Sequence, residues 1–327
     1  MKLTRLYGLI GRNLGHSFSE GWFGEKFARE GIADAEYRNF PLADIAELPA
    51  LLASHPDLRG FNVTIPYKES ILPYLSAVEG AAERIGAVNC VAVEHVADEM
   101  ACRRDSGTTG VGVPTERRGD VATEAFVVED TAEIWCGSAM AEMVAAGLRG
   151  GVAAVENAVD ACNGLSCQAE DGAIRLVGYN TDAPAFGETL PALIGGERPD
   201  ALVLGSGGAA KAVCCALAGM GIRHTVVSRT PTDGMLSYDR LDGGIIASHR
   251  LIVNTTPLGM WPATDACPPI PYNLLTPAHF LYDLVYNPVE TEFLRLGRER
   301  GAATMNGQAM LVRQAELSWH IWNRCNC

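Results

Sequence analysis

Residues 201–221 read ALVLGSGGAAKAVCCALAGMG. The apolar opening predicts a buried strand, and the alanine-rich run after the glycines predicts a helix. Between them, Gly205, Gly207 and Gly208 permit a tight turn and let the backbone approach a pyrophosphate, which binds at the N–H groups and positive dipole end of a helix. The stretch therefore predicts a strand–turn–helix unit that holds a nucleotide, with a plain strand-to-helix turn as the alternative.

The following strand, HTVVSRT at 224–230, narrows the choice of nucleotide. Its end carries Ser228, Arg229 and Thr230, where the adenosine ribose of a dinucleotide lies. An acidic residue there binds the 2′-hydroxyl of NAD, whereas arginine and a hydroxyl suit the 2′-phosphate of NADP. The sequence favours NADP, although Asp233 weakens the positive field and a solvated arginine is the alternative.

Outward from this unit, β-rich runs alternate with helical patterns in both directions. The N-terminal part reads as βαβαβ and ends in the strand GFNVTIP at 60–66, and the rhythm resumes at AIRLVGYN, 173–180. Such alternation predicts largely parallel sheets with right-handed crossovers and helices on both faces. Because 327 residues exceed the usual single-domain length of about 100–200, we expect an α/β fold of two domains, the second of them doubly wound.

Two further segments shape this organisation. Residues 95–168 are first polar and glycine-rich and then alanine-rich, and they contain no motif that indicates chemistry. This stretch, called the insertion below, interrupts the alternation of strands and helices. The last helix repeats apolar positions at Leu311, Ala315, Trp319 and Trp322. We expect this stripe to pack on the first domain and to make that domain discontinuous.

Charge and composition exclude several classes of partner. A formal net charge of -13 argues against binding to nucleic acid or an anionic membrane, because such partners need basic surfaces. No stretch approaches the roughly 18 consecutive apolar residues of a membrane span, and the N-terminal apolar run is too short for a secretory signal. The cysteines show no C-x-x-C spacing, so we expect reduced thiols, no metal site and a cytoplasmic location.

Other strings place polar side chains at strand ends, where α/β sheets bind ligands. GFNVTIPYKES presents Lys68 at the start of a helix, a place suited to proton transfer or to contact with an anion. Asn89 lies in GAVNCV, and Asp182 ends the string Asn180-Thr181-Asp182. Taken alone, these have plainer interpretations, a surface lysine for Lys68 and a helix N-cap for Asp182.

These strings occur together and in one order. The chain carries, from its N-terminus, YGLIGRNLGHSFS, GFNVTIPYK, IGAVN, GYNTD, LGSGGAAKA, SRT, NTTPLGM, DLVYNP and GQAMLVRQA. In this order it resembles the shikimate dehydrogenase family over nearly its whole length outside the insertion. The resemblance implies NADPH-dependent reversible reduction of 3-dehydroshikimate to shikimate, a step toward chorismate and the aromatic amino acids.

The resemblance also implies roles for single residues. Lys68 and Asp182 would form the catalytic pair, because an ammonium beside the reacting oxygen can donate a proton and stabilise negative charge, while a carboxylate orients the lysine. Residues implied in binding the carboxylate and hydroxyls of shikimate are Ser17, Ser19, Thr64, Asn89, Tyr286 and Gln314. Residues implied in binding the cofactor are Gly205, Gly207, Gly208, Ala209, Ser228, Arg229, Thr230, Met260 and Gly307.

The implied architecture is a discontinuous substrate domain and a Rossmann-like NADP domain with a deep cleft between them. Its expected parts are a substrate-binding domain at 1–94, the insertion at 95–170, the NADP domain at 171–285, and C-terminal helices at 286–327 that return to the first domain. The expected partner is a small-molecule substrate, without nucleic acid or membrane, and the chain is expected to be a monomer or a homodimer.

The sequence departs from the family in two places. Ser228 stands where members that use NADP often carry Asn, and no second basic residue closely follows Arg229, which weakens the implied preference for NADP over NAD. The insertion replaces what is usually a short hairpin turn, and a fold tolerates this at an exposed site because loop-closure entropy grows only logarithmically with length. We expect an accessory segment without a catalytic role, and a regulatory or oligomerisation element is the alternative. Two alternatives stay open: a quinate or dual quinate/shikimate dehydrogenase, and a catalytically inactive nucleotide-sensing protein on the same scaffold.

Overall fold

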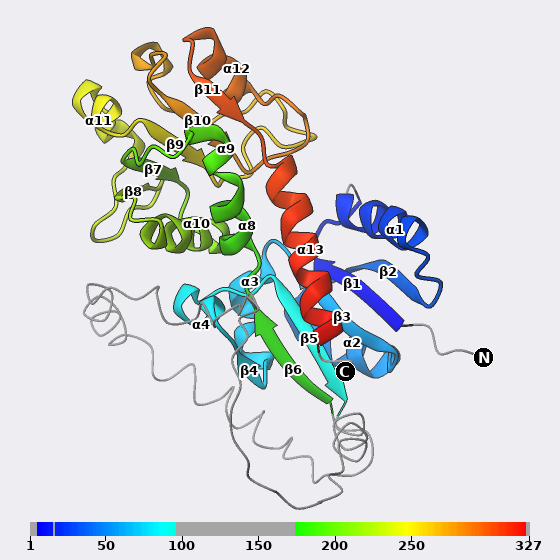
Figure 1. The fold of residues 1–327 in the computed structure, drawn as a ribbon. Coiled ribbons are helices and arrows are strands. Elements are labelled where there is room, and N and C mark those ends of the chain that lie inside the picture. The colour runs from blue at the N-terminus through cyan, green and yellow to red at the C-terminus, as the bar shows by residue number, and fades with distance from the viewer. Residues whose placement is uncertain (1–4, 16, 96–173, 325–327) are drawn as a thin grey trace, which may run out of the picture. The chain divides into compact units, whose positions relative to one another are not determined.

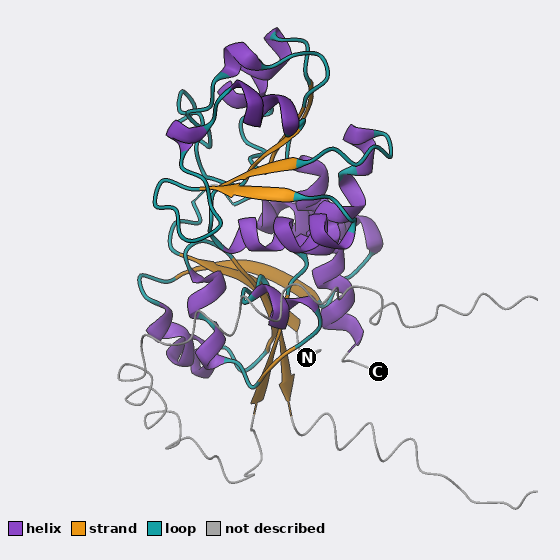
Figure 2. Ribbon diagram, turned by 90° about the vertical axis from the view of Figure 1, so that its left-hand side faces the viewer, coloured by secondary structure: helices purple, strands orange, loops and turns teal. Residues whose placement is uncertain are grey.

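The computed structural model describes residues 5–15, 17–95 and 174–324, which form two β-sheets flanked by helices (Figure 1, Figure 2). The insertion expected at 95–170 lies outside the described residues except for His95. In the part of the chain that is described, no helix has both the length and the apolar content needed to cross a membrane.

The first sheet is mixed and has the strand order β2-β1-β3-β5-β6-β4. Its strands are β1 (Arg5–Gly11), β2 (Ala35–Pro41), β3 (Leu58–Val63), β4 (Ala77–Val78), β5 (Cys90–His95) and β6 (Ile174–Tyr179). β1 runs parallel to β2 and β3, whereas β5 runs antiparallel to β3 and pairs Cys90 with Asn62. The start of β5 therefore lies at the same edge of the sheet as the end of β3.

Both faces of the first sheet are covered. Its α-helices are α1 (Phe18–Glu30), α2 (Leu48–Ser54), α3 (Tyr67–Ser70) and α4 (Ala81–Ile85), with the short 3₁₀ helices η1 (Ile45–Glu47) and η2 (Leu72–Tyr74). In β1, Leu6 and Ile10 pack in the core under α2, α3 and α4, whereas Tyr7 and Leu9 pack in the core under α1. Successive side chains point to opposite faces, so a strand buried on both faces is apolar at nearly every position.

The second sheet is fully parallel and has the strand order β11-β10-β9-β7-β8. Its strands are β7 (Ala201–Leu204), β8 (His224–Val227), β9 (Leu251–Asn254), β10 (Phe280–Asp283) and β11 (Ala303–Met305). The strand order reverses between β7 and β9. In open α/β sheets, ligands bind outside the carboxyl ends of the strands at such a switch point.

Helices cover both faces of the second sheet as well, which confirms the doubly wound fold. One face packs against α8 (Asp182–Thr189), α9 (Pro191–Ile194) and α10 (Gly208–Gly219). The other packs against α11 (Gly243–Ser248) and α12 (Glu292–Glu299). The 3₁₀ helices of this part are η4 (Tyr238–Arg240) and η5 (Tyr272–Leu274).

The last helix, α13 (Gln308–Arg324), packs on the first sheet, as its apolar stripe predicts. The ring of Trp322 stacks on Tyr7 with centroids 5.0 Å apart, and its Nε1 donates to the carbonyl of Val91 at 2.9 Å. A Cβ at Gly60 would come within 2.3 Å of Trp322 Cδ1, so this approach requires glycine.

Two of the expected domain boundaries are wrong. β6 does not open the second domain at residue 171, because it lies beside β5 in the first sheet and pairs Val177 with Ala77 of β4. The second sheet also continues past residue 285, since β11 pairs with β10 and α12 packs in its core. Strand partners are chosen by long-range pairing, which the local sequence pattern does not reveal.

Candidate active site

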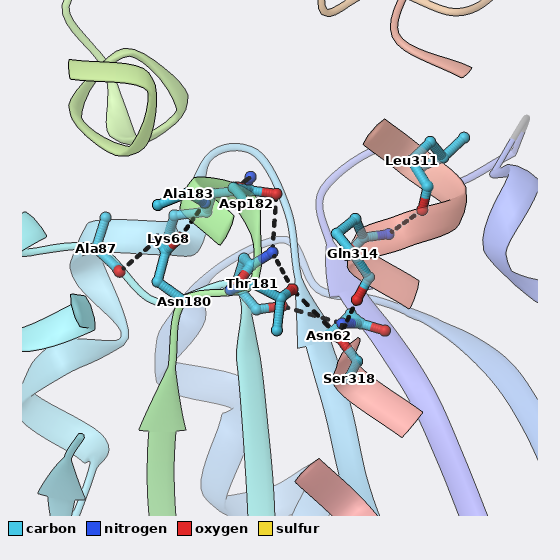
Figure 3. Close-up of polar contacts among 11 residues, drawn as sticks. Asn62, Lys68, Ala87, Asn180, Thr181, Asp182, Ala183, Leu311, Gln314 and Ser318 are labelled. Atoms are coloured by element: carbon cyan, nitrogen blue, oxygen red, sulfur yellow. Dashed lines mark hydrogen bonds and ion pairs between the residues drawn. The ribbon is translucent and has the colours of Figure 1, made fainter. Parts of the chain in front are cut away.

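The predicted catalytic residues meet at the edge of the first sheet. Lys68 lies on α3, which follows the end of β3, and Asp182 opens α8 directly after β6. Although they are 114 positions apart, Lys68 Nζ lies 2.5 Å from Asp182 Oδ2 (Figure 3). The side chains of Lys68 and Asp182 are 18% and 8% exposed, so the pair is largely shielded from solvent without being fully buried. An ammonium held by a carboxylate in this way can donate a proton to an oxygen placed beside it.

The alternative role for Asp182, a simple helix cap, is filled by a neighbour. Asn180 Oδ1 accepts from the N–H of Ala183 at 3.0 Å in the first turn of α8. The carboxylate of Asp182 instead receives Lys68 on one oxygen and, on the other, the Nδ2 of Asn89 at 2.8 Å. Two independent contacts therefore fix the orientation of this acid.

Asn89 is predicted to contact substrate, and its side chain also builds the turn before α8. Its Oδ1 accepts from the N–H of Thr181 at 2.6 Å, and its Nδ2 donates to the Thr181 hydroxyl at 2.9 Å. With the bond to Asp182, this anchors the end of β6 to the start of β5. Asn89 is 3% exposed, so positioning the acid is the role that its geometry favours.

A buried polar network joins this site to the last helix, and no motif of the sequence predicts it. Asn62 at the end of β3 donates to Ser318 Oγ of α13 at 2.8 Å and accepts from the Tyr37 hydroxyl at 2.9 Å. Ser318 in turn donates to the carbonyl of Gln314 at 2.9 Å (Figure 3). The available signals were an amide inside a buried strand and a serine within an apolar helical stripe.

The remaining predicted substrate residues lie on neighbouring segments. Ser17 caps α1, where its Oγ accepts from the N–H of Ser19 at 3.3 Å. Thr64 follows β3 and donates its N–H to Ile10 at the end of the adjacent β1. Tyr286 packs edge-on against Phe18 with ring centroids 5.9 Å apart, and burial raises the pKa of its phenol.

Gln314 is positioned differently from what its predicted role suggests. Its side chain is mostly buried, and its Nε2 donates to the carbonyl of Leu311 one turn earlier in α13 at 3.0 Å (Figure 3). This contact holds the amide against its own helix. A contact from Gln314 to a ligand stays a prediction.

The glycine turn has the geometry that a phosphate site needs. Gly205 has φ +113°, and a Cβ there would lie 2.7 Å from Thr255 Oγ1. Gly207 is the N-cap of α10, and no side chain caps that helix. Apart from Gly207 and its chain neighbours, no described residue has an atom within 4 Å of the place where a Cβ of Gly207 would be. The N–H groups at the start of α10 are therefore open to an anion.

The same turn reaches the catalytic lysine. A Cβ at Gly208 would lie 3.2 Å from Lys68 Cβ and 3.3 Å from Ala87 Cβ, so the start of α10 contacts the segment that carries the ion pair. Ala209 follows as a half-buried residue in the first turn of α10. A dinucleotide seated on this turn would extend beside Lys68.

Of the three predicted residues after β8, Ser228 holds the turn in place, whereas Arg229 and Thr230 are exposed to solvent. Ser228 is buried, its Oγ accepts from the N–H of Thr230 at 3.2 Å, and it lies 3.3 Å from Ser206 Oγ in the glycine turn. Arg229 and Thr230 are exposed, and Arg229 forms no ion pair with any described carboxylate, Asp233 included. The guanidinium is thus available for an anionic group.

Met260 and Gly307, predicted at the nicotinamide end, come from segments that follow β9 and β11. Met260 is 41% exposed at the end of the 254–260 segment. The backbone of Gly307 packs closely against Leu284, the residue after β10. A Cβ at Gly307 would lie 2.2 Å from the carbonyl oxygen of Leu284. Both residues follow the carboxyl ends of strands in the parallel second sheet, as the glycine turn after β7 does.

Comparison with known proteins gives a consistent result. Residues 9–91 match the family model of the shikimate dehydrogenase substrate-binding domain. The shikimate dehydrogenase (NADP(+)) of Moorella thermoacetica is 31% identical over 345 residues, covering 98% of this chain and 88% of that protein. The crystal structure of shikimate dehydrogenase from Aquifex aeolicus superposes with a TM-score of 0.66 at 26% identity, covering 99% of this chain and 94% of the other.

A further similar structure contains ligands. The Thermus thermophilus shikimate 5-dehydrogenase in complex with NADP(H) and shikimate superposes with a TM-score of 0.65 at 26% identity. The similarity covers 98% of this chain and 93% of that one.

Proposed function

This chain belongs to the shikimate dehydrogenase family, and we infer that it catalyses the NADP-dependent interconversion of 3-dehydroshikimate and shikimate. The observation that carries this inference is the Lys68–Asp182 ion pair at 2.5 Å, next to an uncapped helix start at Gly208. A protein that only sensed a nucleotide would need the glycine turn but not a shielded ammonium–carboxylate pair beside it.

The residues of the turn fit a dinucleotide. Gly205 adopts a backbone conformation that a side chain would strain, and the space next to Gly207 is open, so phosphate oxygens can reach the N–H groups at the start of α10. Arg229 and Thr230 supply the cation and hydroxyl for the 2′-phosphate, while Ser228 holds their turn. When bound, NADPH supplies the hydride that reduces the ring ketone.

The chain's own residues manage the proton. In the reducing direction the Lys68 ammonium donates a proton to the carbonyl oxygen of 3-dehydroshikimate as negative charge develops there. In the reverse direction the neutral amine accepts the proton from the hydroxyl of shikimate. Asp182 pairs with the ammonium of Lys68 and, because Asn89 holds the second oxygen of Asp182, keeps that ammonium in one orientation.

The proposed substrate is a small anion, whereas the protein has a formal net charge of -13. The substrate carboxylate therefore needs a local set of hydrogen-bond donors. Ser17, Ser19 and Tyr286 supply hydroxyls for it, and their grouping around Phe18 supports this role. For the ring hydroxyls we propose contacts from Thr64, Asn89 and Gln314, although Asn89 also holds Asp182 and the Gln314 amide bonds its own helix. The protein acts on this small molecule in the cytoplasm, as a monomer or homodimer, without nucleic acid or membrane partners.

Steady-state kinetics with shikimate or quinate, each combined with NADP or NAD, test this proposal. We expect the highest kcat/KM for shikimate with NADP. A higher kcat/KM for quinate would indicate a quinate dehydrogenase. Binding of NADP without turnover of either substrate would indicate the inactive binding protein.

A further inference from the structure

A second buried carboxylate, Asp283, has no role in the chemistry described above. It is the last residue of β10 and is 0% exposed. Its Oδ1 accepts from Asn254 Nδ2 at 2.9 Å and from the N–H of Val285 at 3.0 Å, and its Oδ2 accepts from the Thr291 hydroxyl at 2.5 Å. All three donors are neutral, and no described lysine, arginine or histidine lies within ion-pair distance of it.

This arrangement is costly for the fold. Burial raises the pKa of Asp283 to about 6, against the hydrogen bonds from Thr291, Val285 and Asn254 that lower it. An aliphatic side chain of similar size would fill the same space without desolvating a charge. What the carboxylate adds is the capacity to accept three hydrogen bonds from three separate segments at once.

The first of these segments leads to Met260. Asn254, held by Asp283, accepts through Oδ1 from the N–H and the hydroxyl of Thr256, at 3.0 and 2.7 Å. The turn continues to Gly259, with φ +89°, where a Cβ would lie 3.3 Å from Thr291 Cβ. The segment is thus fastened at its start by Asn254 and packed at its end against Thr291, and both of these residues donate to Asp283.

The segment that contains Val285 leads to both Tyr286 and Gly307. The bond from Asp283 to the N–H of Val285 fixes the backbone one residue before Tyr286. Gly307 donates its N–H to the carbonyl of Val285 at 3.1 Å, so its position depends on the same stretch. The carboxylate of Asp283 therefore helps to position Tyr286, which is predicted to border the substrate. It also helps to position Met260 and Gly307, which are predicted at the nicotinamide end.

We propose that Asp283 is a positioning residue for the dehydrogenase reaction. It acts through Asn254 and Val285, which set the 254–260 and 284–286 segments so that Met260, Tyr286 and Gly307 shape the space where nicotinamide and substrate meet. The inference rests on the proposed function, since it assigns these segments to that reaction. It adds a residue that touches neither ligand.

The decisive variant is Asp283→Asn, which keeps the size but turns one acceptor oxygen into a donor. We expect kcat with shikimate and NADP to fall by about 10- to 100-fold, the scale of a small misplacement of reacting groups. We expect the Kd for NADP to change little, because Arg229 and the glycine turn do not contact Asp283. The matched control is Asp242→Asn, an exposed aspartate that caps α11 in the same part of the chain.

A second measurement does not depend on activity. In the ligand-free protein, amide hydrogen exchange in peptides covering 254–261 and 284–287 should be faster in Asp283→Asn than in the parent, and unchanged in 205–210. Thr291→Val removes one donor and leaves the carboxylate, so it should shift kcat and exchange in the same direction by less. It replaces Asp283→Asn if that variant does not fold.

The outcomes separate the two proposals. An active parent with kcat and exchange unchanged in Asp283→Asn overturns the positioning role alone. A parent that turns over neither shikimate nor 3-dehydroshikimate overturns the proposed function and this inference together. Equal losses in kcat, in NADP binding and in exchange protection across the whole second sheet would identify Asp283 as a purely structural residue.

Discussion

Asp182 and Asp283 are both buried carboxylates beside the carboxyl end of a strand, one at each sheet, yet their surroundings differ. Asp182 faces the Lys68 ammonium at 2.5 Å and keeps 8% of its side chain exposed. Asp283 is 0% exposed and is surrounded by neutral donors. A carboxylate that assists proton transfer needs a charged partner and access to substrate, whereas a carboxylate that holds backbone segments needs only fixed donors.

The largest effect is expected from removing Lys68, the charged partner of Asp182. Lys68→Ala should lower turnover by about 10²- to 10⁴-fold, the usual contribution of a positioned acid, and should leave the KM for shikimate nearly unchanged. Steady-state kinetics measure both constants. Turnover that stays close to that of the parent would contradict the assigned role.

The second contrast concerns pH and stability. Because folding raises the pKa of Asp283 from 3.8 to about 6, the folded state binds more protons than the unfolded state between those values. The contribution of Asp283 therefore makes the free energy of unfolding fall as the pH rises from about 4 to about 6. The total decrease is roughly 2–3 kcal/mol. Asp283→Asn removes that dependence but also weakens hydrogen bonds, each worth about 1 kcal/mol.

We therefore expect the unfolding free energy of Asp283→Asn, relative to the parent, to increase from pH 4 to pH 6 and then level off. Urea unfolding of both proteins across this range measures the difference, in which the other carboxylates cancel. A difference that is flat with pH would mean that folding does not raise the pKa of Asp283.

Arg229 extends the comparison to a charge that has no protein partner among the described residues. Arg229→Ala should weaken NADP binding by roughly 1–3 kcal/mol, the scale of a charge-assisted contact, with little effect on NAD. The matched control is Arg223→Ala, whose guanidinium is exposed and pairs with Asp200 at 2.7 Å. Equal losses for NADP and NAD in titrations would show that Arg229 does not read the 2′-phosphate.

Replacing residues 96–173 by Asn-Gly should have a smaller effect on activity. β5 and β6 are neighbours that run in opposite directions (Figure 1), and Arg175 Nη1 donates to Glu94 Oε2 at 2.9 Å across their ends. A two-residue turn can close such a pair if the register is kept. The shortened protein should keep most of its shikimate activity, and kinetics with thermal melting test this. If the shortened proteins fold and bind NADP in every strand register tested but show no turnover, the insertion contributes to the active site.

The smallest effect is expected from an exposed ion pair next to the catalytic one. Glu69 follows Lys68 on α3 and contacts Lys211 of α10 at 2.5 Å, with both side chains at least 40% exposed. Solvent screens such pairs, so Glu69→Gln should change stability by about 0–1 kcal/mol and leave kcat near that of the parent. A loss comparable to that of Lys68→Ala would show that exposure does not separate the two pairs.

The pairing of Lys68 with Asp182 is implied by the resemblance to the family, which depends on the order of several strings along the chain. The local sequence pattern itself predicts the α/β class, the doubly wound second sheet and the strand end that favours NADP. Each of these rests on a contiguous string whose backbone role is local, such as the glycine turn before α10 or the NVTIPYK stretch. Physical rules for turns, caps and strand ends act over a few residues, so these features can be recognised without a structure.

Only the tertiary structure decided that β6 joins the first sheet, that Asn89 fixes Asp182, and that Ser228 positions a turn. It also revealed the bond between Asn62 and Ser318, 256 positions apart, and the three segments that Asp283 holds together. Polar contacts of this kind join residues that are distant in the chain and leave no local periodicity. Their partners are chosen when the strands and helices pack, because a buried donor or acceptor must find its hydrogen bond there.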